Sequence, residues 1–183
     1  MATIRDCAIL YQGLLKKKYK FTLENNISFT LEFSPAYFYH LLGLEKLTDI
    51  TQLRNVSPSK VYKDIISGKI AHSTIQKSKH FELISDRIQY FENLPELVYF
   101  DKSNKIIIDF DKDKLDFNSL LKNTKYILYK RFDIKYIHLT IGSKLTLYPE
   151  TFIVEPGSTY ISEQTLLDIL SIDIIERQSA KSK

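Results

Sequence analysis

The chain has 183 residues and is 44% hydrophobic and 26% charged, with only 5 Gly and 5 Pro, which excludes an intrinsically disordered chain and suits one compact domain. Its single cysteine, Cys7, excludes an internal disulfide bond and a cysteine-based zinc site, and no apolar run approaches the ~20 residues that a membrane helix needs. The formal charge of +4 favours polyanionic partners only slightly. The N-terminus has no signal-peptide pattern, and we expect a cytoplasmic protein without a membrane partner as the default.

The beginning of the chain predicts a helix followed by a β-hairpin. Apolar residues recur at helical spacing in residues 2–18, which end in three lysines, and cations in a last helical turn complement the helix dipole. Two runs of β-type residues, 19–23 and 27–33, then flank a Glu-Asn-Asn turn. Because asparagine tolerates the positive φ of a tight turn, these runs predict a hairpin over 19–33.

The stretch after the hairpin combines helix signals with side chains that can carry chemistry. Ser34 is a good N-cap residue, and Pro35 suits the first helical position. The helix that they open is rich in aromatic residues and contains His40, and Gly43 predicts a break before Lys46. A short helix that only packs in the core does not need an imidazole, a glycine turn and a lysine so close together, so this stretch is a candidate functional site.

The segment between this aromatic helix and Pro95 predicts two or three short helices. Ser57-Pro58 repeats the start signal, and Gly68 is placed for a C-terminal stop. Ser73 is a candidate cap for the next helix, whose apolar spacing continues until Pro95.

From residue 97 the apolar period changes from helical to alternating, and short polar links join the runs, which predicts an antiparallel meander. The residues between these runs include a solvated charge cluster and a single helical turn. The predicted strands are 97–100, 105–110, 126–132, 135–141, 145–148 and 151–154; the charge cluster is 111–116, the turn is 117–121, and 166–175 suits either a strand or a helix.

These elements predict an α+β protein in which N-terminal helices and a β-hairpin pack against a C-terminal antiparallel sheet. Residues 1–178 are expected to form a single domain, with a mainly helical part over 1–96 and a mainly sheet part over 97–178. Residues 179–183 are expected to be a disordered tail.

The predicted strand 135–141 presents the most chemically useful alternation in the chain. If its apolar residues face the core, Tyr136, His138 and Thr140 display a phenol, an imidazole and a hydroxyl on one open face. An imidazole can take a proton from a ribose 2′-hydroxyl, and a nearby cation stabilises charge on the phosphoryl oxygens. We therefore expect His40 and His138 to meet at one site with a basic side chain.

The identity of that basic side chain depends on the hairpin loop. A two-residue loop at Asp133-Ile134 places Arg131 opposite Tyr136 on the histidine face. One more loop residue brings Lys130 to that face instead, because a slip of one residue exchanges the faces of a strand. Both registers are open from the sequence, and we favour Lys130.

Common cofactor and metal motifs are missing from the sequence. There is no GxxxxGK[ST], no GxGxxG and no HExxH or comparable spacing, so neither a cofactor nor a metal site is predicted. Cys7 and the serines lack the local signature of a catalytic nucleophile. His72 and His80 lie near predicted helix ends and are expected to have no specific role.

Several motifs together resemble one known family. The string HLLGLEKLTDI follows the FTLENNISFTLEF hairpin, and YK, YIHL and PETF come later in the chain. In these motifs the chain is similar to the phage-type barnase–EndoU–colicin–RelE-like nucleases, specifically the fourth such phage family, over about residues 19–174. The resemblance implies helices on an antiparallel sheet, a phage or prophage origin and a metal-independent ribonuclease-like site. Carried over position by position, that site comprises His40, Lys46, Lys130, His138 and Thr151.

Three functions follow as hypotheses for a protein of the bacterial host cell. The first is a metal-independent endoribonuclease acting on RNA, with DNA as a further candidate partner. The second is a phage counter-defence (anti-CRISPR) protein that inhibits an RNA-guided effector nuclease by binding it or DNA without catalysis. The third is a nucleic-acid-binding module without turnover, whose sign is salt-sensitive binding. The expected catalytic residues are His40, His138, Lys130 and Thr151, and the expected nucleic-acid contacts are Lys46, Arg131, Tyr136, Thr140 and Tyr148.

Overall fold

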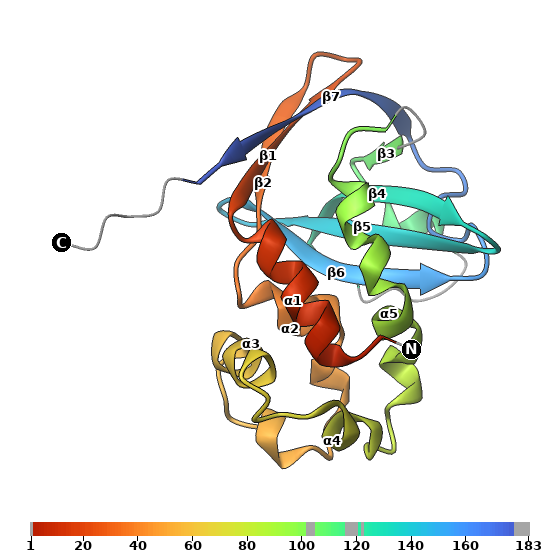
Figure 1. Ribbon diagram of the computed structural model, residues 1–183. Helices are drawn as coiled ribbons and strands as arrows, with labels where there is room; N and C mark the ends of the chain where they lie inside the picture. Colours follow the sequence, from red (N-terminus) through yellow and green to blue (C-terminus); the bar gives the residue numbers. More distant parts are fainter. Residues whose placement is uncertain (1, 102–104, 116–120, 122, 178–183) are drawn as a thin grey trace.

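A computed structural model describes residues 2–101, 105–115, 121 and 123–177 of the chain. Within these residues the strands form one antiparallel sheet of seven strands in the order β2-β1-β7-β3-β4-β5-β6, and the helices lie against it (Figure 1). The predicted α+β class is confirmed. The predicted tail 179–183 and most of the predicted helical turn 117–121 lie outside the described residues.

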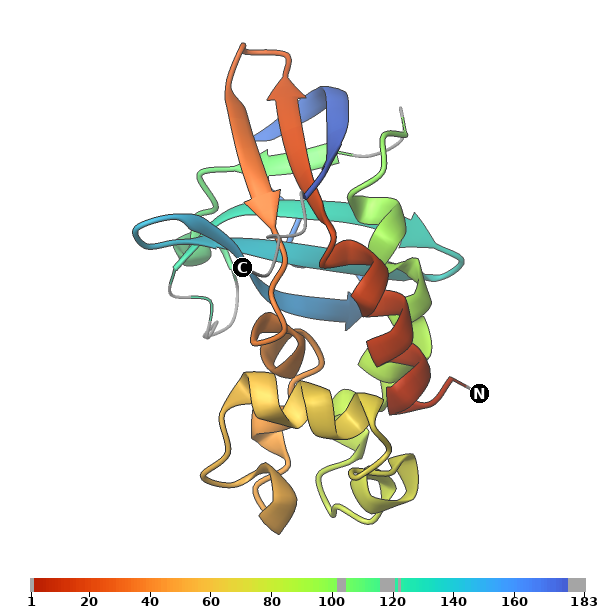
Figure 2. The same ribbon diagram turned by 60° about the vertical axis from the view of Figure 1, so that its left-hand side comes forward.

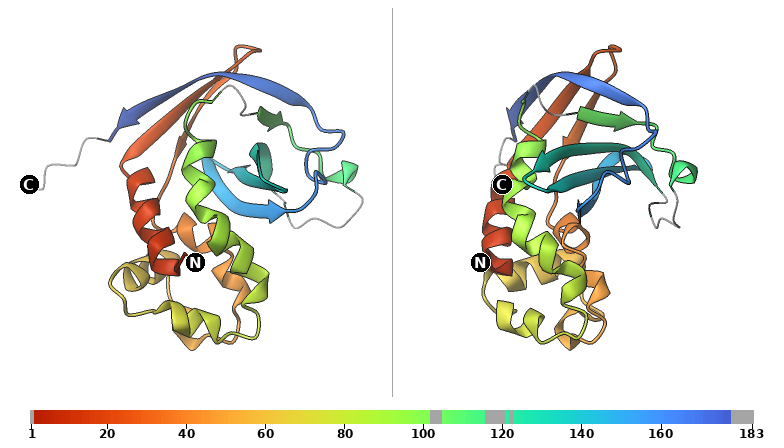
Figure 3. Two further views of the ribbon diagram at one scale, coloured as in Figure 1. Left: turned by 45° about the vertical axis from the view of Figure 1, so that its right-hand side comes forward. Right: turned by 90° about the vertical axis from the view of Figure 1, so that its right-hand side faces the viewer.

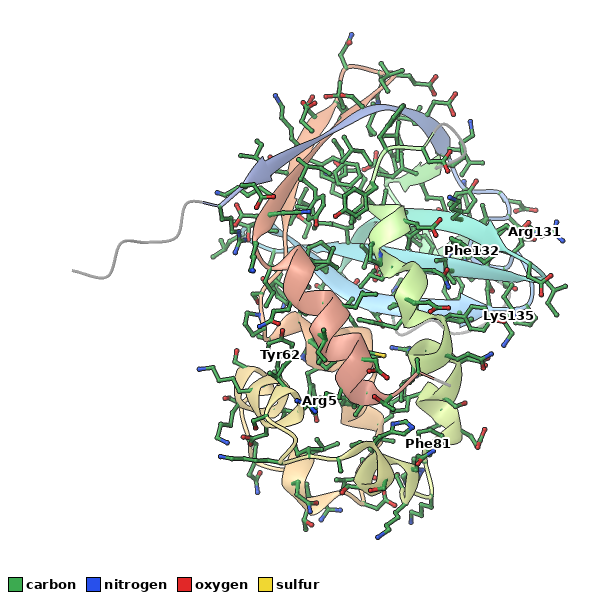
Figure 4. The ribbon with its side chains drawn as sticks, in the orientation of Figure 1. Arg5, Tyr62, Phe81, Arg131, Phe132 and Lys135 are labelled. Carbon is green, nitrogen blue, oxygen red and sulfur yellow. The ribbon has the colours of Figure 1, made fainter. Side chains whose placement is uncertain are left out.

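The helices are short and are fixed mainly by packing. α1 begins with a capping box, in which Thr3 and Asp6 exchange hydrogen bonds, and α3 begins with the predicted serine and proline. Tyr62 on α3 reaches α1, where its hydroxyl donates to the carbonyl of Ala8 (Figure 4). The α-helices are α1 (Ile4–Leu14), α2 (Tyr37–Leu41), α3 (Pro58–Ile66), α4 (His72–Gln76) and α5 (Glu82–Tyr90), and the 3-10 helices are η1 (Leu44–Lys46), η2 (Thr51–Leu53), η3 (Phe91–Leu97) and η4 (Lys112–Lys114).

The predicted hairpin is part of the same sheet as the C-terminal strands. Its first strand pairs along its length with the last strand of the chain, and this last strand pairs in turn with the third. The ambiguous run near the C-terminus is therefore a strand. The strands are β1 (Lys17–Leu23), β2 (Ser28–Glu32), β3 (Lys105–Ile108), β4 (Thr124–Phe132), β5 (Lys135–Ser143), β6 (Leu147–Glu155) and β7 (Leu166–Glu176).

The sheet curls into a half-barrel, so that its two edge strands come near each other. β7 arches from the hairpin over to β3, and the hairpin stands steeply against the β4–β6 strands (Figures 2 and 3). The first and last strands of the sheet order, β2 and β6, are in contact. Phe91 packs edge-on against both Phe38 and Phe152, and these three rings join α2, η3 and β6 in the main core.

The opposite face of the β4–β5 region is also covered. Ile107, Leu121 and Ile127 form a second buried cluster. Tyr160 and Ile161, which follow β6 in the chain, pack against it. Both faces of the middle of β4 and β5 are therefore away from solvent.

Five local predictions differ from the structure. The runs 145–148 and 151–154, predicted as two strands, are one strand, β6. The lysine run begins β1 instead of ending α1. α2 begins at Tyr37 with Ala36 at its N-cap, because Pro35 and Ala36 form a turn first. α4 is capped by Ala71 and not by Ser73. The predicted strand 97–100 is wrong, since the 3-10 helix η3 runs through Pro95 to Leu97.

Candidate active site between the helices and the sheet edge

A cavity of about 820 Å³ lies where α2, η1 and α5 meet the edge strand β6. It brings together His40 and Lys46 from the first half of the chain with Tyr148 and Thr151 from the second. The sequence predicted all four as site residues, and the fold places them around one space. The other charged residues in its wall are Arg87, Lys144, Glu45, Glu82, Asp86 and Glu150.

Arg87 ties the walls of this cavity together. Its Nη1 donates to Thr151 Oγ1 at 2.9 Å and contacts the carbonyl oxygens of His40 and Leu41 at 3.4 and 3.3 Å. Burial lowers the pKa of Arg87, although a guanidinium keeps its charge in proteins. The cavity therefore contains a fixed positive charge held in one orientation by α2 and β6.

Gly43 makes this arrangement possible. Its φ is +72°, a left-handed conformation that favours glycine, and it ends α2 at the predicted break. A Cβ at this position would lie 3.0 Å from Arg87 Nη1 and 3.3 Å from Ile84 Cγ2. The glycine thus serves both the turn and the close approach of the guanidinium.

Lys46 and His40 face the cavity from either side of that turn. Burial, and then the charge of Arg87, lower the pKa of Lys46, while Glu45 acts in the opposite direction. His40 is half exposed, with 52% of its side chain accessible, and its Nδ1 lies 3.7 Å from Glu45 Oε2. An accessible imidazole beside a carboxylate and a lysine that releases its proton more readily than usual are groups that can transfer protons.

Thr151 is positioned by Thr140 on the neighbouring strand. The Thr140 hydroxyl accepts a hydrogen bond from the Thr151 N–H at 3.1 Å and donates to the Thr151 carbonyl at 3.4 Å, next to an irregularity in the β5–β6 pairing. Thr140 is fully buried. Its predicted place on an open face is therefore wrong, because the hydroxyl is used within the sheet.

His138 is also buried, which contradicts the predicted open face. Its side chain is 0% exposed and is packed among Tyr129, Tyr136 and Tyr160. Its Nε2 lies 2.9 Å from Glu155 Oε1, but without the alignment of a hydrogen bond.

The two histidines that were expected to meet do not share the cavity. His138 pairs with Ile153 across the β5–β6 ladder, and Ile153 and Tyr160 line the cavity in front of it. Among the described lining residues His40 is the one imidazole. The alternation along the predicted strand 135–141 could not show that residues after β6 cover His138.

The favoured register of the β4–β5 hairpin is also wrong. The loop has two residues, so Arg131 pairs with Tyr136 on the His138 face and Lys130 pairs with Ile137 on the opposite face. Lys130 Nζ instead contacts Asp101 at 2.8 Å and Glu96 at 3.0 Å.

Arg131 and Tyr136 are likewise outside the cavity. Arg131 lies at the end of the hairpin and points away from the body of the molecule, 5.9 Å from the Tyr136 ring (Figure 4). The predicted site residues thus divide into a group at the cavity, a buried group behind it, a pair on the hairpin, and Lys130 on the opposite face of the sheet.

Sequence reasoning missed Arg87, although a signal for it exists. Ile84 and Ile88 are buried one turn apart on α5, and Arg87 lies between them on the same side of the helix. An arginine within the apolar stripe of an amphipathic helix must find partners inside the fold. This spacing could have identified it as a candidate.

The cavity carries charges of both signs. Of its carboxylates, Asp86 is paired with Lys135 at 2.6 Å, and Glu150 accepts a hydrogen bond from Thr124. No group of three or more His, Cys, Asp or Glu side chains that could hold a metal ion occurs among the described residues. In the same part of the chain, every helix is too short or too polar to cross a bilayer.

The fold and the cavity together define an α+β protein that gathers an imidazole, an amine and a guanidinium at the edge of a curled antiparallel sheet. The sequence profile of one family, described as phage-Barnase-EndoU-ColicinE5/D-RelE like nuclease4, matches residues 3–177. The chain belongs to this family of phage nuclease-like proteins, which confirms the resemblance seen in its motifs. Comparison with curated proteins and with solved structures gave no match.

Proposed function

We propose that the protein is an endoribonuclease that cleaves RNA without a metal ion at the cavity beside β6. Membership of a nuclease family implies a nucleic-acid substrate. The observation that supports this activity is that His40, Lys46 and Arg87 line one cavity. These side chains provide a proton acceptor, a proton donor and a fixed cation, the three functions that RNA transphosphorylation requires.

In the proposed reaction His40 acts as the general base. The imidazole removes the proton of a ribose 2′-hydroxyl, and the 2′-oxygen attacks the adjacent phosphorus. The bond from phosphorus to the 5′-oxygen breaks, and the Lys46 ammonium protonates that leaving oxygen. The products are a 2′,3′-cyclic phosphate and a free 5′-hydroxyl. A lowered lysine pKa suits the role of acid, because it makes the proton easier to transfer near neutral pH.

Arg87 stabilises the charge on the phosphoryl oxygens in this proposal. Its Nη1 is held by Thr151 Oγ1 and by two carbonyl oxygens of α2, so the guanidinium does not need to reorganise when charge develops. Thr151 and Thr140 are positioning residues, since they fix Arg87 and do not contact the reacting atoms. We assign His138 a positioning role too, because it packs behind Tyr160 in the cavity wall.

The test is cleavage of a labelled RNA in the presence of EDTA. Wild-type protein should give a product ending in a 2′,3′-cyclic phosphate, and His40→Ala should lower the rate by about 10²–10⁴-fold, the usual contribution of a general base. His80→Ala is the matched control, because it removes an imidazole that does not line the cavity. Loss of wild-type cleavage in EDTA, or equal cleavage by both variants, would contradict the proposal.

A binding function without turnover is the alternative outcome of the same work. Salt-sensitive RNA or DNA binding by a wild-type protein that does not cleave would favour a nucleic-acid-binding module. Inhibition of an RNA-guided CRISPR effector that survives His40→Ala would favour the counter-defence hypothesis. Binding or inhibition by a wild-type protein that does not cleave RNA would remove the catalytic roles proposed for the cavity residues.

A further inference from the structure

Two tyrosine rings form part of the cavity wall. Tyr37 comes from α2 and Tyr148 from β6, and their ring centroids lie 5.8 Å apart with an angle of 26° between the ring planes. Both residues are half-buried, and both line the cavity. They therefore present a joint aromatic surface to the same space as His40 and Lys46.

Tyr148 is held in place by the strand beside it. Gly142 pairs with Tyr148 across the β5–β6 ladder, and a Cβ at Gly142 would lie 2.6 Å from Tyr148 Cζ and 2.7 Å from its hydroxyl oxygen. The Tyr148 ring thus lies against β5 at Gly142, where the absence of a side chain leaves room for it. A side chain fixed in this way loses little conformational entropy when a ligand stacks on it.

The position of the tyrosine pair relative to the proposed reacting groups suits a nucleotide. Tyr37 and His40 are three residues apart on α2, so their side chains project from neighbouring positions on one side of the helix. Lys144 Nζ lies 5.8 Å from the centroid of the Tyr148 ring and lines the same cavity. One ring of the aromatic surface therefore comes from the helix that carries His40, and the other ring has a cation near it.

We propose that Tyr37 and Tyr148 stack an unpaired base of the nucleotide next to the cleaved phosphate, which makes single-stranded RNA the substrate class. The inference rests on the proposed endoribonuclease function and adds the recognition of the base. Aromatic side chains bind bases of single strands through the π-face that every base has. In a duplex those faces are covered by neighbouring base pairs, so the same surface discriminates against double-stranded RNA.

The experiment measures binding by fluorescence anisotropy in a His40→Ala background, which prevents turnover. The probes are a labelled single-stranded RNA of about ten nucleotides, the same RNA with one abasic position, and its duplex. Tyr148→Ala and Tyr37→Ala should each weaken binding of the intact single strand by about 5- to 150-fold, the effect of losing one stacked base. Tyr148→Phe keeps the ring and should bind like its parent.

The matched control is Tyr99→Ala. Tyr99 also has a lysine over its ring, Lys17 at 5.4 Å, but it does not line the cavity. This variant should bind single-stranded RNA like the parent. Gly142→Ala should weaken binding as Tyr148→Ala does, because the added methyl group displaces a ring that is still present. Thermal unfolding of each variant shows whether it is folded under the binding conditions.

The abasic probe decides whether stacking is the cause. At one abasic position the loss caused by Tyr148→Ala should disappear, because the base that it contacts is already missing. Equal losses with intact and abasic probes, equal binding of duplex and single strand, or unchanged binding by both alanine variants would overturn the inference. RNA cleavage that depends on His40 but not on either tyrosine would refute the stacking and leave the proposed function intact. Tyrosine-dependent binding without cleavage would refute the function alone.

Discussion

Arg87 Nη1 lies 2.9 Å from Thr151 Oγ1, and this hydrogen bond joins α5 to the edge strand of the sheet across the wall of the cavity. The two residues are 64 positions apart in the chain. The same nitrogen contacts two carbonyl oxygens at the end of α2. A single half-buried guanidinium therefore connects the three elements that carry the candidate site.

We expect Arg87→Lys to lower RNA cleavage by about 10²–10³-fold, because an ammonium cannot reproduce the fork of donors that fixes the guanidinium. Thr151→Val removes the acceptor while keeping the shape and should cause a smaller loss. The rates of both variants and of the double variant form a double-mutant cycle.

In that cycle the effect of Thr151→Val should largely vanish once Arg87 has been replaced, because the hydroxyl acts through the arginine. Thr151→Ser is the control, since it restores the hydroxyl. Fully additive losses would show that Thr151 acts independently of Arg87.

The lowered pKa of Lys46 makes a prediction about stability and pH. In the unfolded chain this lysine titrates near its ordinary value, whereas burial lowers its pKa in the folded protein. Between the folded and the unfolded pKa of Lys46 the unfolded state binds more protons, so the free energy of unfolding increases as pH rises through this window. Below the folded pKa the desolvation cost is fully present. Lys46→Met should therefore stabilise the protein at neutral pH, and the difference should shrink toward alkaline pH in urea titrations.

A pH profile of cleavage tests the catalytic role of the same residue. The alkaline limb should reflect loss of the Lys46 proton, below the pH at which an ordinary lysine titrates. Lys46→Arg retains the charge but is a poor acid, so its rate should be low and this limb should be absent. An unchanged alkaline limb in the variant would assign the acid to another group.

The two histidines should separate stability from chemistry. His138→Ala removes a fully buried ring that is packed among three tyrosines, so we expect a loss of about 1–3 kcal/mol in the free energy of unfolding. His40→Ala should leave the unfolding free energy nearly unchanged and abolish most of the cleavage. If the folded fraction of His138→Ala has the same catalytic loss as His40→Ala, His138 is a catalytic residue.

Lys130 should contribute to stability and not to cleavage. Asp101, and to a smaller extent Glu96, raise the pKa of Lys130, so this contribution is fully present below the ordinary lysine pKa and is lost as pH rises through the raised value. Lys130→Ala should cost about 0.2–1 kcal/mol at neutral pH, and less at high salt. Chemical denaturation at two salt concentrations measures this cost. A large loss of RNA cleavage in Lys130→Ala would show instead that Lys130 takes part in the reaction.

Much of the local structure was predictable because it depends on neighbours in the chain. Alternating apolar residues and a Glu-Asn-Asn turn defined the first hairpin, and Gly43 marked the end of α2 through its left-handed conformation. The motif around His40 and Lys46 lies within a few residues, so the sequence also indicated that these two side chains share a site. The strand at 97–100 failed because the 3-10 helix η3 and its core contacts outweigh the local β preference.

The placement of His138, Arg87 and Lys130 was decided by the tertiary structure. Alternation along a strand tells which residues share a face, but whether that face is open depends on segments far away in the chain, here the residues after β6 that cover His138. A loop of two residues rather than three placed Arg131 on the face where Lys130 was expected. The sequence by itself determined most of the elements and the family. Which residues line the cavity was set by long-range packing, because burial is a property of the whole fold.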